Sequence, residues 1–393
     1  MPVRVINIMT TLTPDEDLRG ATHTLRDGGL VVLPTETVYG VAGRLDLPGT
    51  RDRLRALRAA NNDMAWTLHL ADPDAAWQHV PRTKSAERLV KKLWPGPVGI
   101  IFDVPAEMQE ANARRLNVQP GDLYERGTIA LRCPDHPVFA EVVGPVDAPI
   151  ALTRLGDVGS SLPGNFAASG VDVDLAIDAG PTRFNKPSTL VKADAEGYSI
   201  VRAGVFDERI IQRQLRTTIL FVCSGNTCRS PMAEALARKI VAESIGVEPE
   251  RLEEHGIDVR SAGVYAMPGT RATPQAVEAV RDLSADLSAH RSQALTPELL
   301  HAADAIYAMG RSHADAVAML SRVATSRLRL LDAAGDIEDP IGSDVQTYRT
   351  LAEKMVGLIR QRLDEDGILK GIGKGIGQTP AKPAEKPVEG GRP

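Results

Sequence analysis

Cysteine, aromatic residues, positive charge and long apolar runs are all scarce in this chain of 393 residues. Three cysteines are too few for a disulfide framework and predict a reducing compartment. Lys and Arg total 46 against 51 Asp and Glu, a net charge of -5, which argues against binding nucleic acid through bulk positive charge but leaves a local basic groove open. Neither a signal-like N-terminus nor a run of about 18 apolar residues occurs, so we expect a cytoplasmic protein without a membrane span.

The length and composition predict several globular domains. Hydrophobic residues make up 43% and charged residues 25%, as in ordinary globular proteins, and at roughly 100 to 200 residues per domain we expect two or three domains. A charged segment at 207–216 predicts a helical connector between domains at 1–206 and 217–365. The segment 366–393 is rich in Gly, Lys and Pro and predicts a flexible tail, because this composition cannot bury apolar surface.

After residue 216, short apolar runs rich in β-branched residues alternate with helical patterns. This alternation is typical of a parallel sheet covered by helices. We expect strands at 218–222, 257–261, 305–309 and 328–331, and a long final helix at 345–363. The second domain is therefore predicted to be a small, doubly wound α/β domain with a four-stranded parallel sheet.

Between the first of these strands and the helix after it, five residues separate Cys223 from Arg229. A loop of this length at a helix N-terminus can wrap its backbone N–H groups around one tetrahedral oxyanion, and the helix dipole adds favourable charge. The guanidinium of Arg229 can bind two phosphoryl oxygens, and the same positive field favours the nucleophilic thiolate of Cys223. The alternative, a small buried cysteine and an unrelated surface arginine, leaves the coincidence of strand, glycine, spacing and helix unexplained.

Residues 222–231 resemble the phosphate-loop motif of the low-molecular-weight protein phosphatases, which include tyrosine phosphatases, arginine phosphatases and some arsenate reductases. The resemblance covers about residues 216–365 and includes Arg260-Ser261-Ala262-Gly263, His290-Arg291-Ser292 and Asp339-Pro340. It implies that Cys223 forms a phosphocysteine, that Arg229 stabilises the transition state, and that Asp339 acts as general acid and then as general base. It also implies a cofactor-free phosphate loop formed by Ser224, Gly225, Asn226, Thr227, Cys228 and Ser230, with the Ser230 hydroxyl bonded to the thiolate.

Two of these residues have alternative interpretations. Asp339 precedes the last predicted helix, where a loop can overhang the phosphate site, but an Asp there also suits a turn or a helix cap. Cys228 is either a small buried residue or a reserve thiol that forms a disulfide with Cys223 under oxidants. No histidine or cysteine spacing typical of a metal site occurs, so we predict no metal in this domain.

The resemblance favours a phosphorylated protein substrate, with phosphoarginine first and phosphotyrosine next. Tyrosine-specific members carry aromatic residues just after the Asp-Pro pair, whereas this chain has Ile341-Gly342 there. Thr227 marks the arginine phosphatases of the family, and a polar Thr227 with a carboxylate at Asp339 suits the N–H donors of a guanidinium. An arsenate reductase is disfavoured because the resolving pair of cysteines near the chain end is absent.

The first domain is predicted to be mixed α/β. A buried strand near 29–33 runs into a polar turn, and further strands are expected at 66–70, 98–102, 128–131 and 188–192 with helices between them. The residue types alone do not assign its chemistry, since Thr35, Glu36 and Thr37 suit a strand end with caps equally well.

This domain resembles the YrdC-like threonylcarbamoyl-AMP synthases, which use threonine, bicarbonate and ATP to support tRNA modification. The matching stretches are Pro34 to Gly40, His69, Trp94 to Pro97, Leu131 to Pro134, Ser188-Thr189 and Arg202 to Gly204. The resemblance implies a YrdC-like fold, ATP with Mg²⁺ if the domain is active, and a pocket lined by Thr35, Arg58, His69, Arg132 and Ser188.

Two of that family's ATP-site motifs are altered here. Arg58-Ala59-Ala60 stands in place of a Lys-x-Arg, and Thr153-Arg154-Leu155 in place of a Ser-Ala-Asn. Losing a phosphate-binding arginine lowers transition-state stabilisation by about 2 kcal/mol or more, because its hydrogen bonds are charge-assisted. Two hypotheses therefore stay open: a working synthase in which Arg58 or Arg154 replaces the lost charge, or a non-catalytic module that binds nucleotide or RNA and positions or regulates the phosphatase. The altered motifs favour the second hypothesis.

Overall fold

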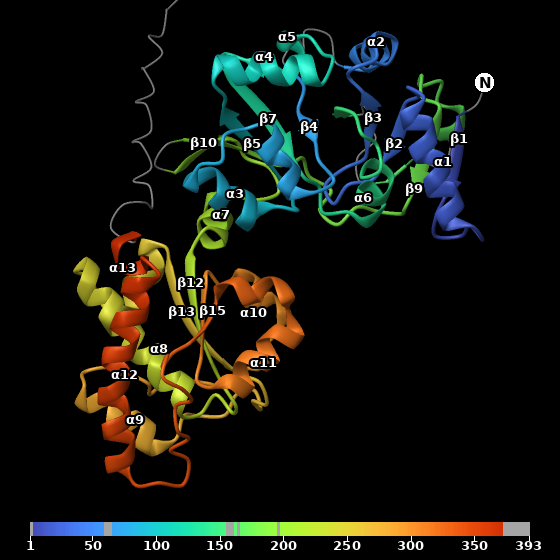
Figure 1. Ribbon diagram of the computed structural model, residues 1–393. Helices are drawn as coiled ribbons and strands as arrows, with labels where there is room; N and C mark the ends of the chain where they lie inside the picture. Colours follow the sequence, from blue (N-terminus) through green and yellow to red (C-terminus); the bar gives the residue numbers. More distant parts are fainter. Residues whose placement is uncertain (1–2, 59–64, 155–160, 163–165, 195–196, 372–393) are drawn as a thin grey trace, which may run out of the picture. The chain divides into compact units, whose positions relative to one another are not determined.

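The computed structural model describes residues 3–58, 65–154, 161–162, 166–194 and 197–371, which form two compact units (Figure 1). The first unit extends to Ile211 and the second begins at Gln212. Within the described ranges, no helix is both long and apolar enough to cross a membrane.

In its described residues, the first unit is built on one mixed sheet of eleven strands, in the order β1-β9-β2-β3-β8-β4-β7-β5-β10-β11, with β6 paired to β7. The strands are β1 (Arg4–Asn7), β2 (Val31–Leu33), β3 (Gly40–Arg44), β4 (Leu68–His69), β5 (Val98–Asp103), β6 (Tyr124–Glu125), β7 (Thr128–Arg132), β8 (Ile150–Arg154), β9 (Leu175–Asp178), β10 (Thr189–Ala193) and β11 (Tyr198–Arg202). The helices are α1 (Pro14–Arg26), α2 (Pro48–Ala56), η1 (Pro73–Gln78), α3 (Lys84–Leu93), α4 (Ala106–Arg115), α5 (Pro120–Leu123), α6 (Pro137–Val143) and η2 (Phe166–Ala168).

The predicted strands of this unit are present, and two are shorter than expected. The strand predicted near 29–33 extends only over Val31–Leu33, as β2. Only Leu68 and His69 of the predicted strand 66–70 join the sheet, as β4. The flanking backbone N–H groups of Trp66 and Leu70 donate instead to the carbonyls of Asp122 and Arg132, at 2.7 and 2.8 Å. The mixed α/β architecture predicted for this part of the chain is confirmed.

The second unit has a parallel four-stranded sheet in the order β13-β12-β14-β15. Its strands are β12 (Thr217–Cys223), β13 (Ile257–Gly263), β14 (Ala305–Ala308) and β15 (Leu328–Leu330). Its helices are α8 (Arg229–Ile245), η3 (Pro249–His255), α9 (Pro274–Asp282), α10 (Pro297–Ala302), α11 (Arg311–Leu320), η4 (Arg322–Arg327), α12 (Val345–Glu365) and α13 (Ile368–Gly371). The doubly wound α/β fold predicted from the alternation of strands and helices is confirmed.

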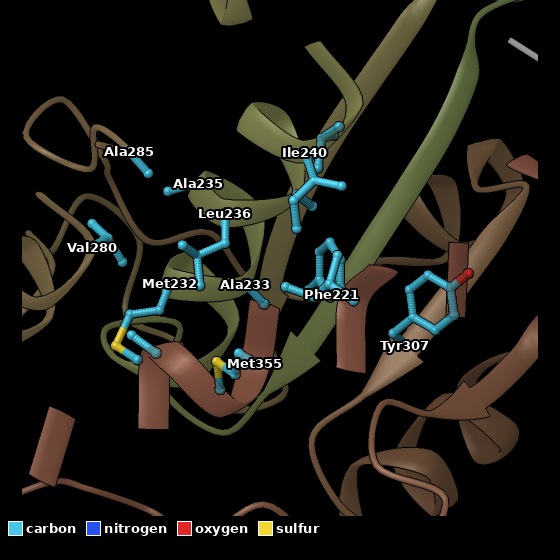
Figure 2. Close-up of a cluster of buried hydrophobic side chains, with 14 of the residues drawn as sticks. Phe221, Met232, Ala233, Ala235, Leu236, Ile240, Val280, Ala285, Tyr307 and Met355 are labelled. Atoms are coloured by element: carbon cyan, nitrogen blue, oxygen red, sulfur yellow. The ribbon is translucent and has the colours of Figure 1, made fainter. Parts of the chain in front are cut away.

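Alternate side chains of β12 supply two separate cores, because successive strand residues point to opposite faces of a sheet. Phe221 faces the larger cluster with α8, α9 and α12, where Figure 2 shows Leu236 and Ile240 gathered beside it. Val222 faces the smaller cluster, with residues of α10 and α11. Both faces of the sheet are therefore covered, and β12 is held inside it with its carboxyl end free to carry a loop. Sheets of this type bind ligands at this edge, at the point where the order of the strands reverses.

The ends of the second unit differ in one respect from the prediction. The segment 207–216 is helical as expected, forming α7 (Glu208–Gln214). The predicted tail begins at residue 366, but Asp366 accepts hydrogen bonds from Tyr307 and Arg329, at 2.6 and 2.8 Å, and α13 follows it. The chain therefore stays packed beyond the predicted boundary, because long-range partners hold a segment whose local composition is unfavourable; residues 372–393 of the predicted tail lie outside the described residues.

Candidate active site

The predicted phosphate loop of the second unit connects an inner strand of the sheet to a long helix. Cys223 is the last residue of β12, and Arg229 is the first residue of α8. Cys223 is buried, with 3% of its surface exposed, and Arg229 is 7% exposed. The loop therefore lies where the carboxyl end of a buried strand meets a helix N-terminus, as the sequence predicts.

The Cys223 sulfur lies among hydrogen-bonding groups of its own loop. Its Sγ is 2.9 Å from the Ser230 Oγ, and the backbone N–H of Asn226 donates to the same sulfur at 3.3 Å. When Cys223 is a thiolate, both of these groups act as donors to it, and hydrogen bonds to a charged form stabilise that form. The predicted contact between Ser230 and Cys223 is therefore present in the geometry.

Asn226 fixes the shape of the loop. Its φ of 54° lies in the left-handed region, which Asn tolerates better than most residues. Its Nδ2 donates to the hydroxyls of Ser230 and Ser261, at 3.0 and 2.8 Å, and its Oδ1 accepts from the backbone N–H of Gln293 at 2.8 Å. The His290 Nε2 lies 2.9 Å from the Asn226 carbonyl. The buried side chain thus ties the loop to β13 and to the segment before α10.

Glu234 extends this network behind the loop and was not singled out from the sequence. It accepts a hydrogen bond from Ser261 at 2.6 Å and lies 4.0 Å from the Nδ1 of His290. Burial raises the pKa of Glu234, and burial lowers the pKa of His290. The only sequence signal is that Glu234 lies four residues after Ser230 on the helix, which places it one turn further along the same face.

Arg229 and Asp339 are adjacent in space although they are 110 positions apart in the sequence. The Arg229 Nη2 donates to the Asp339 Oδ2 at 2.5 Å, and its Nη1 donates to the carbonyl of Ile337 at 2.9 Å. The Asp339 side chain is 41% exposed, whereas that of Arg229 is 9% exposed. A carboxylate at the open side of the loop can reach both the loop and an approaching substrate.

The remaining loop residues bond within the same unit. The Cys228 Sγ lies 3.3 Å from the hydroxyl of Tyr348 on α12 and 3.7 Å from the Thr227 Oγ1. Burial, followed by the bond to Cys228, raises the pKa of Tyr348 to about 12. Cys228 is thus a buried, hydrogen-bonded thiol, and its role as a reserve thiol stays a prediction. Gly225 and Ser224 complete the loop; Ser224 contacts a histidine, His313, that no sequence motif singled out.

The first unit has a pocket of about 350 Å³ that brings together all five residues predicted there, namely Thr35, Arg58, His69, Arg132 and Ser188. They come from segments far apart in the sequence that β3, β8, β4, β7, β5 and β10 place side by side. Arg154 and Arg202 also line the pocket. Ala59, Ala60 and Leu155 of the altered motifs lie outside the described residues.

The pocket residues differ in charge and exposure. Arg132 is buried and donates to Glu36 at 3.0 Å and to Thr37 at 2.8 Å, so its charge is already paired. Burial, followed by the charge of Arg132, lowers the pKa of His69 to about 3, which keeps its ring neutral at physiological pH. The guanidinium of Arg58 lies over the ring of Trp66, with 3.3 Å between the Cζ atom and the ring centroid.

Neither unit shows a metal-binding group in the part of the chain that the structure describes. There, no three His, Cys, Asp or Glu side chains form a group that could hold a metal ion.

Comparisons with known proteins agree with this division of the chain. The family model described as "Low molecular weight phosphotyrosine protein phosphatase" matches residues 218–367, and the Sua5/YciO/YrdC model, described as "Telomere recombination", matches residues 23–204. The protein-arginine-phosphatase of Bacillus subtilis is 40% identical over 148 residues, which span 36% of this chain and 92% of that protein. The putative threonylcarbamoyl-AMP synthase of Mycobacterium leprae is 27% identical over 213 residues, which span 51% of this chain and 90% of that protein.

Among solved structures, a YwlE mutant from Bacillus subtilis is 37% identical, with a TM-score of 0.34, and the match covers 38% of this chain and 97% of that one. In the sequence matches, a phosphatase-type region follows a synthase-type region along the chain. The chain therefore belongs to the low-molecular-weight phosphotyrosine protein phosphatase family through its second unit, and its first unit matches the Sua5/YciO/YrdC family model.

Proposed function

We propose that the second unit is a phosphoprotein phosphatase in which Cys223 is the nucleophile. The main support for this proposal is the arrangement of hydrogen-bond donors around the Cys223 sulfur, at the point where a helix N-terminus and Arg229 supply positive charge. A tetrahedral oxyanion bound there lies within reach of a thiolate, of backbone N–H groups and of a guanidinium. The 40% identity to a protein-arginine-phosphatase supports the same conclusion.

In the first step, the Cys223 thiolate attacks the phosphorus of the substrate. The S–P bond forms as the bond between phosphorus and the leaving group breaks, and the carboxyl proton of Asp339 passes to the leaving nitrogen or oxygen. Arg229 must exchange its bond to Asp339 for the phosphoryl oxygens, and this exchange leaves the Asp339 carboxylate able to take up from solvent the proton that it then donates as the acid. Ser230 and the N–H of Asn226 hold the sulfur in place before attack.

In the second step, the phosphocysteine is hydrolysed. The Asp339 carboxylate accepts a proton from water, the water oxygen bonds to phosphorus, and the S–P bond breaks. The thiolate of Cys223 leaves with the electron pair of that bond, and inorganic phosphate is released. Asp339 has then regained its proton, and the site is ready for another substrate.

We propose phosphoarginine as the phosphorylated residue. Thr227 is part of the loop and partly exposed, so its hydroxyl is available to a guanidinium N–H of the substrate. Ile341, 65% exposed beside Asp339, offers no aromatic face for a tyrosine ring. The names of two relatives, both protein-arginine-phosphatases, support this preference.

Replacing Thr227 by valine is expected to lower kcat/KM for a phosphoarginine peptide about tenfold, because valine keeps the shape but removes one hydrogen bond. The kcat/KM for the matching phosphotyrosine peptide is expected to stay the same or to rise. Both values are measured by phosphate release from peptides of identical flanking sequence. Thr325→Val, at an exposed threonine in η4, serves as the matched control and should change neither value. An equal loss with both peptides, or a wild type that prefers phosphotyrosine, would reject phosphoarginine.

We propose as a second function that the first unit retains the pocket of a threonylcarbamoyl-AMP synthase. The observation that favours it is that all five predicted residues line one pocket, together with Arg154 and Arg202. Arg58, Arg154 and Arg202 bring positive charge to a space suited to the phosphates of ATP. Glu125 also lines the pocket, and one carboxylate fits a Mg²⁺ ion that arrives on those phosphates. The pocket chemistry thus weighs against the purely non-catalytic hypothesis.

Full-length protein with ATP, Mg²⁺, threonine and bicarbonate is expected to release pyrophosphate only when threonine is present. Arg58→Ala should lower this release about tenfold or more, because a charge-assisted contact to the phosphates is lost. Arg209→Ala, at an exposed position on α7, is the matched control and should release pyrophosphate at the wild-type rate. If phosphatase turnover is normal and pyrophosphate release is absent, the first unit is a binding module instead.

A further inference from the structure

His313 joins the phosphate loop from a neighbouring strand connection. It is the third residue of α11, which begins just after β14, and β14 lies next to β12 in the sheet. Its Nε2 lies 2.8 Å from the Oγ of Ser224, the residue that follows Cys223. This contact bridges the carboxyl ends of β12 and β14, which is the place where the order of the strands reverses.

The burial of His313 indicates that this contact is its main polar interaction. The residue is 5% exposed, and its Nδ1 is buried without a hydrogen-bond partner among the described residues. A buried, unpaired nitrogen is destabilising, and a leucine of similar size would avoid that loss. The bond to Ser224 therefore explains why a histidine, and not an apolar residue, occupies this position.

Ser224 also lies beside the arginine of the site. Its Oγ is 3.5 Å from the Arg229 Nη2, the same nitrogen that donates to Asp339. A serine hydroxyl has one hydrogen to donate and two lone pairs to accept with. If the hydrogen is donated to the His313 Nε2, both lone pairs stay free for donors such as Arg229.

We propose that His313 is a positioning residue of the phosphatase site, which orients the Ser224 hydroxyl as an acceptor for Arg229. This inference rests on the proposed phosphatase function. When phosphate binds and Asp339 separates from Arg229, the Nη2 atom keeps a neutral acceptor in Ser224 and stays aimed at the loop. His313 touches neither the substrate nor the reacting atoms, and it acts through Ser224.

The charges around His313 are compatible with a neutral ring. Arg229 of α8 faces it, as do Asp336 and Asp339 of the segment between β15 and α12. Burial is the largest influence and lowers the pKa of His313; Arg229 lowers it further, and the two carboxylates oppose this effect. A neutral ring leaves Nε2 able to accept the Ser224 hydrogen, whereas a protonated ring would donate to Ser224 and reverse the polarity of the bond.

The test combines a double-mutant cycle with two further measurements on the full chain. Ser224→Ala and His313→Leu are each expected to lower kcat/KM about tenfold, and the double variant should lose no more than either single variant. His313→Gln, whose side-chain amide can replace Nε2, should recover most of the activity. The affinity for inorganic phosphate, measured by calorimetry, should fall several-fold in Ser224→Ala and in His313→Leu, because Arg229 is less well oriented in both. His255→Leu, at an exposed position ending η3, is the matched control and should leave all values unchanged.

The pH profile separates positioning from a purely structural role. Wild-type kcat/KM should fall on the acidic side as His313 is protonated, and this part of the acid limb should be absent in His313→Gln. Additive losses in the double variant, or an unchanged acid limb in His313→Gln with unfolding temperatures equal to wild type, would overturn the proposal. Should the wild type hydrolyse no phosphopeptide, the phosphatase function fails, and the pattern of phosphate affinities still decides whether His313 and Ser224 act as a pair.

Discussion

Replacing Cys223 by serine is expected to abolish phosphatase turnover, with a loss of about four orders of magnitude or more. A serine hydroxyl is far less ionised than a thiol near neutral pH, so the hydrogen-bond donors at this position no longer have an ionised nucleophile to stabilise. The fold should be retained, because the introduced hydroxyl occupies slightly less volume than the thiol at a buried strand end and can bond to Ser230 in the same way.

Binding should separate from turnover in this variant. The backbone N–H groups, the N-terminus of α8 and Arg229 are unchanged, so inorganic phosphate should bind with an affinity within a few-fold of the wild-type value. Phosphate release measures the turnover, and calorimetry measures the binding. The matched control is Cys133→Ala, a buried cysteine in the first unit, which should keep full phosphatase activity. Appreciable turnover by Cys223→Ser would remove Cys223 from the nucleophile role.

The phosphate loop shows how much local sequence can predict. The strand at 218–222, the loop and the helix after it are consecutive in the chain, and the structure confirms the strand and the helix as β12 and α8. The contact between Ser230 and Cys223 lies within the loop and the first turn of the helix, so it joins residues only seven positions apart in the sequence. For such features the sequence carries almost all of the required information.

Contacts from distant segments could not be predicted in the same way. Ser224 and His313 are 89 residues apart, and nothing in the periodicity of either segment indicates that β12 and β14 become neighbours at these positions. Glu234 is one of several polar residues on α8, and only the packing of β13 against β12 gives it Ser261 as a partner. The family resemblance indicated Asp339, because it supplied a long-range relation that spacing alone does not contain.

The pocket of the first unit depends on both kinds of information. Its five predicted residues follow from the resemblance, and the structure places all of them on one pocket although the sheet order is far from the chain order. Arg154 belongs to one of the altered motifs, and Arg202 belongs to one of the matching stretches. Only the fold shows that both side chains line the pocket. A sequence motif indicates which residues differ, whereas the fold indicates whether another side chain occupies the same space.

Replacing Asp339 by asparagine is expected to slow leaving-group departure by about 10²- to 10⁴-fold, the range typical of a lost general acid. The introduced amide has nearly the same shape as the carboxylate and can still accept a hydrogen bond from Arg229, so the geometry of the loop should persist. It cannot transfer a carboxyl proton. The loss should therefore be large for a phosphoarginine or alkyl phosphate substrate and much smaller for p-nitrophenyl phosphate, whose leaving group departs without protonation.

The two roles proposed for Asp339 require separate measurements, because loss of the general base slows phosphocysteine hydrolysis equally for every substrate. Single-turnover release of the leaving group isolates the first step from that shared second step. Glu338→Gln removes a neighbouring carboxylate and serves as the matched control, with both steps expected to proceed at the wild-type rate. Equal slowing of good and poor leaving groups in the first step would exclude Asp339 as the acid. Asp339 would then contribute only through its ion pair with Arg229, which orients the guanidinium.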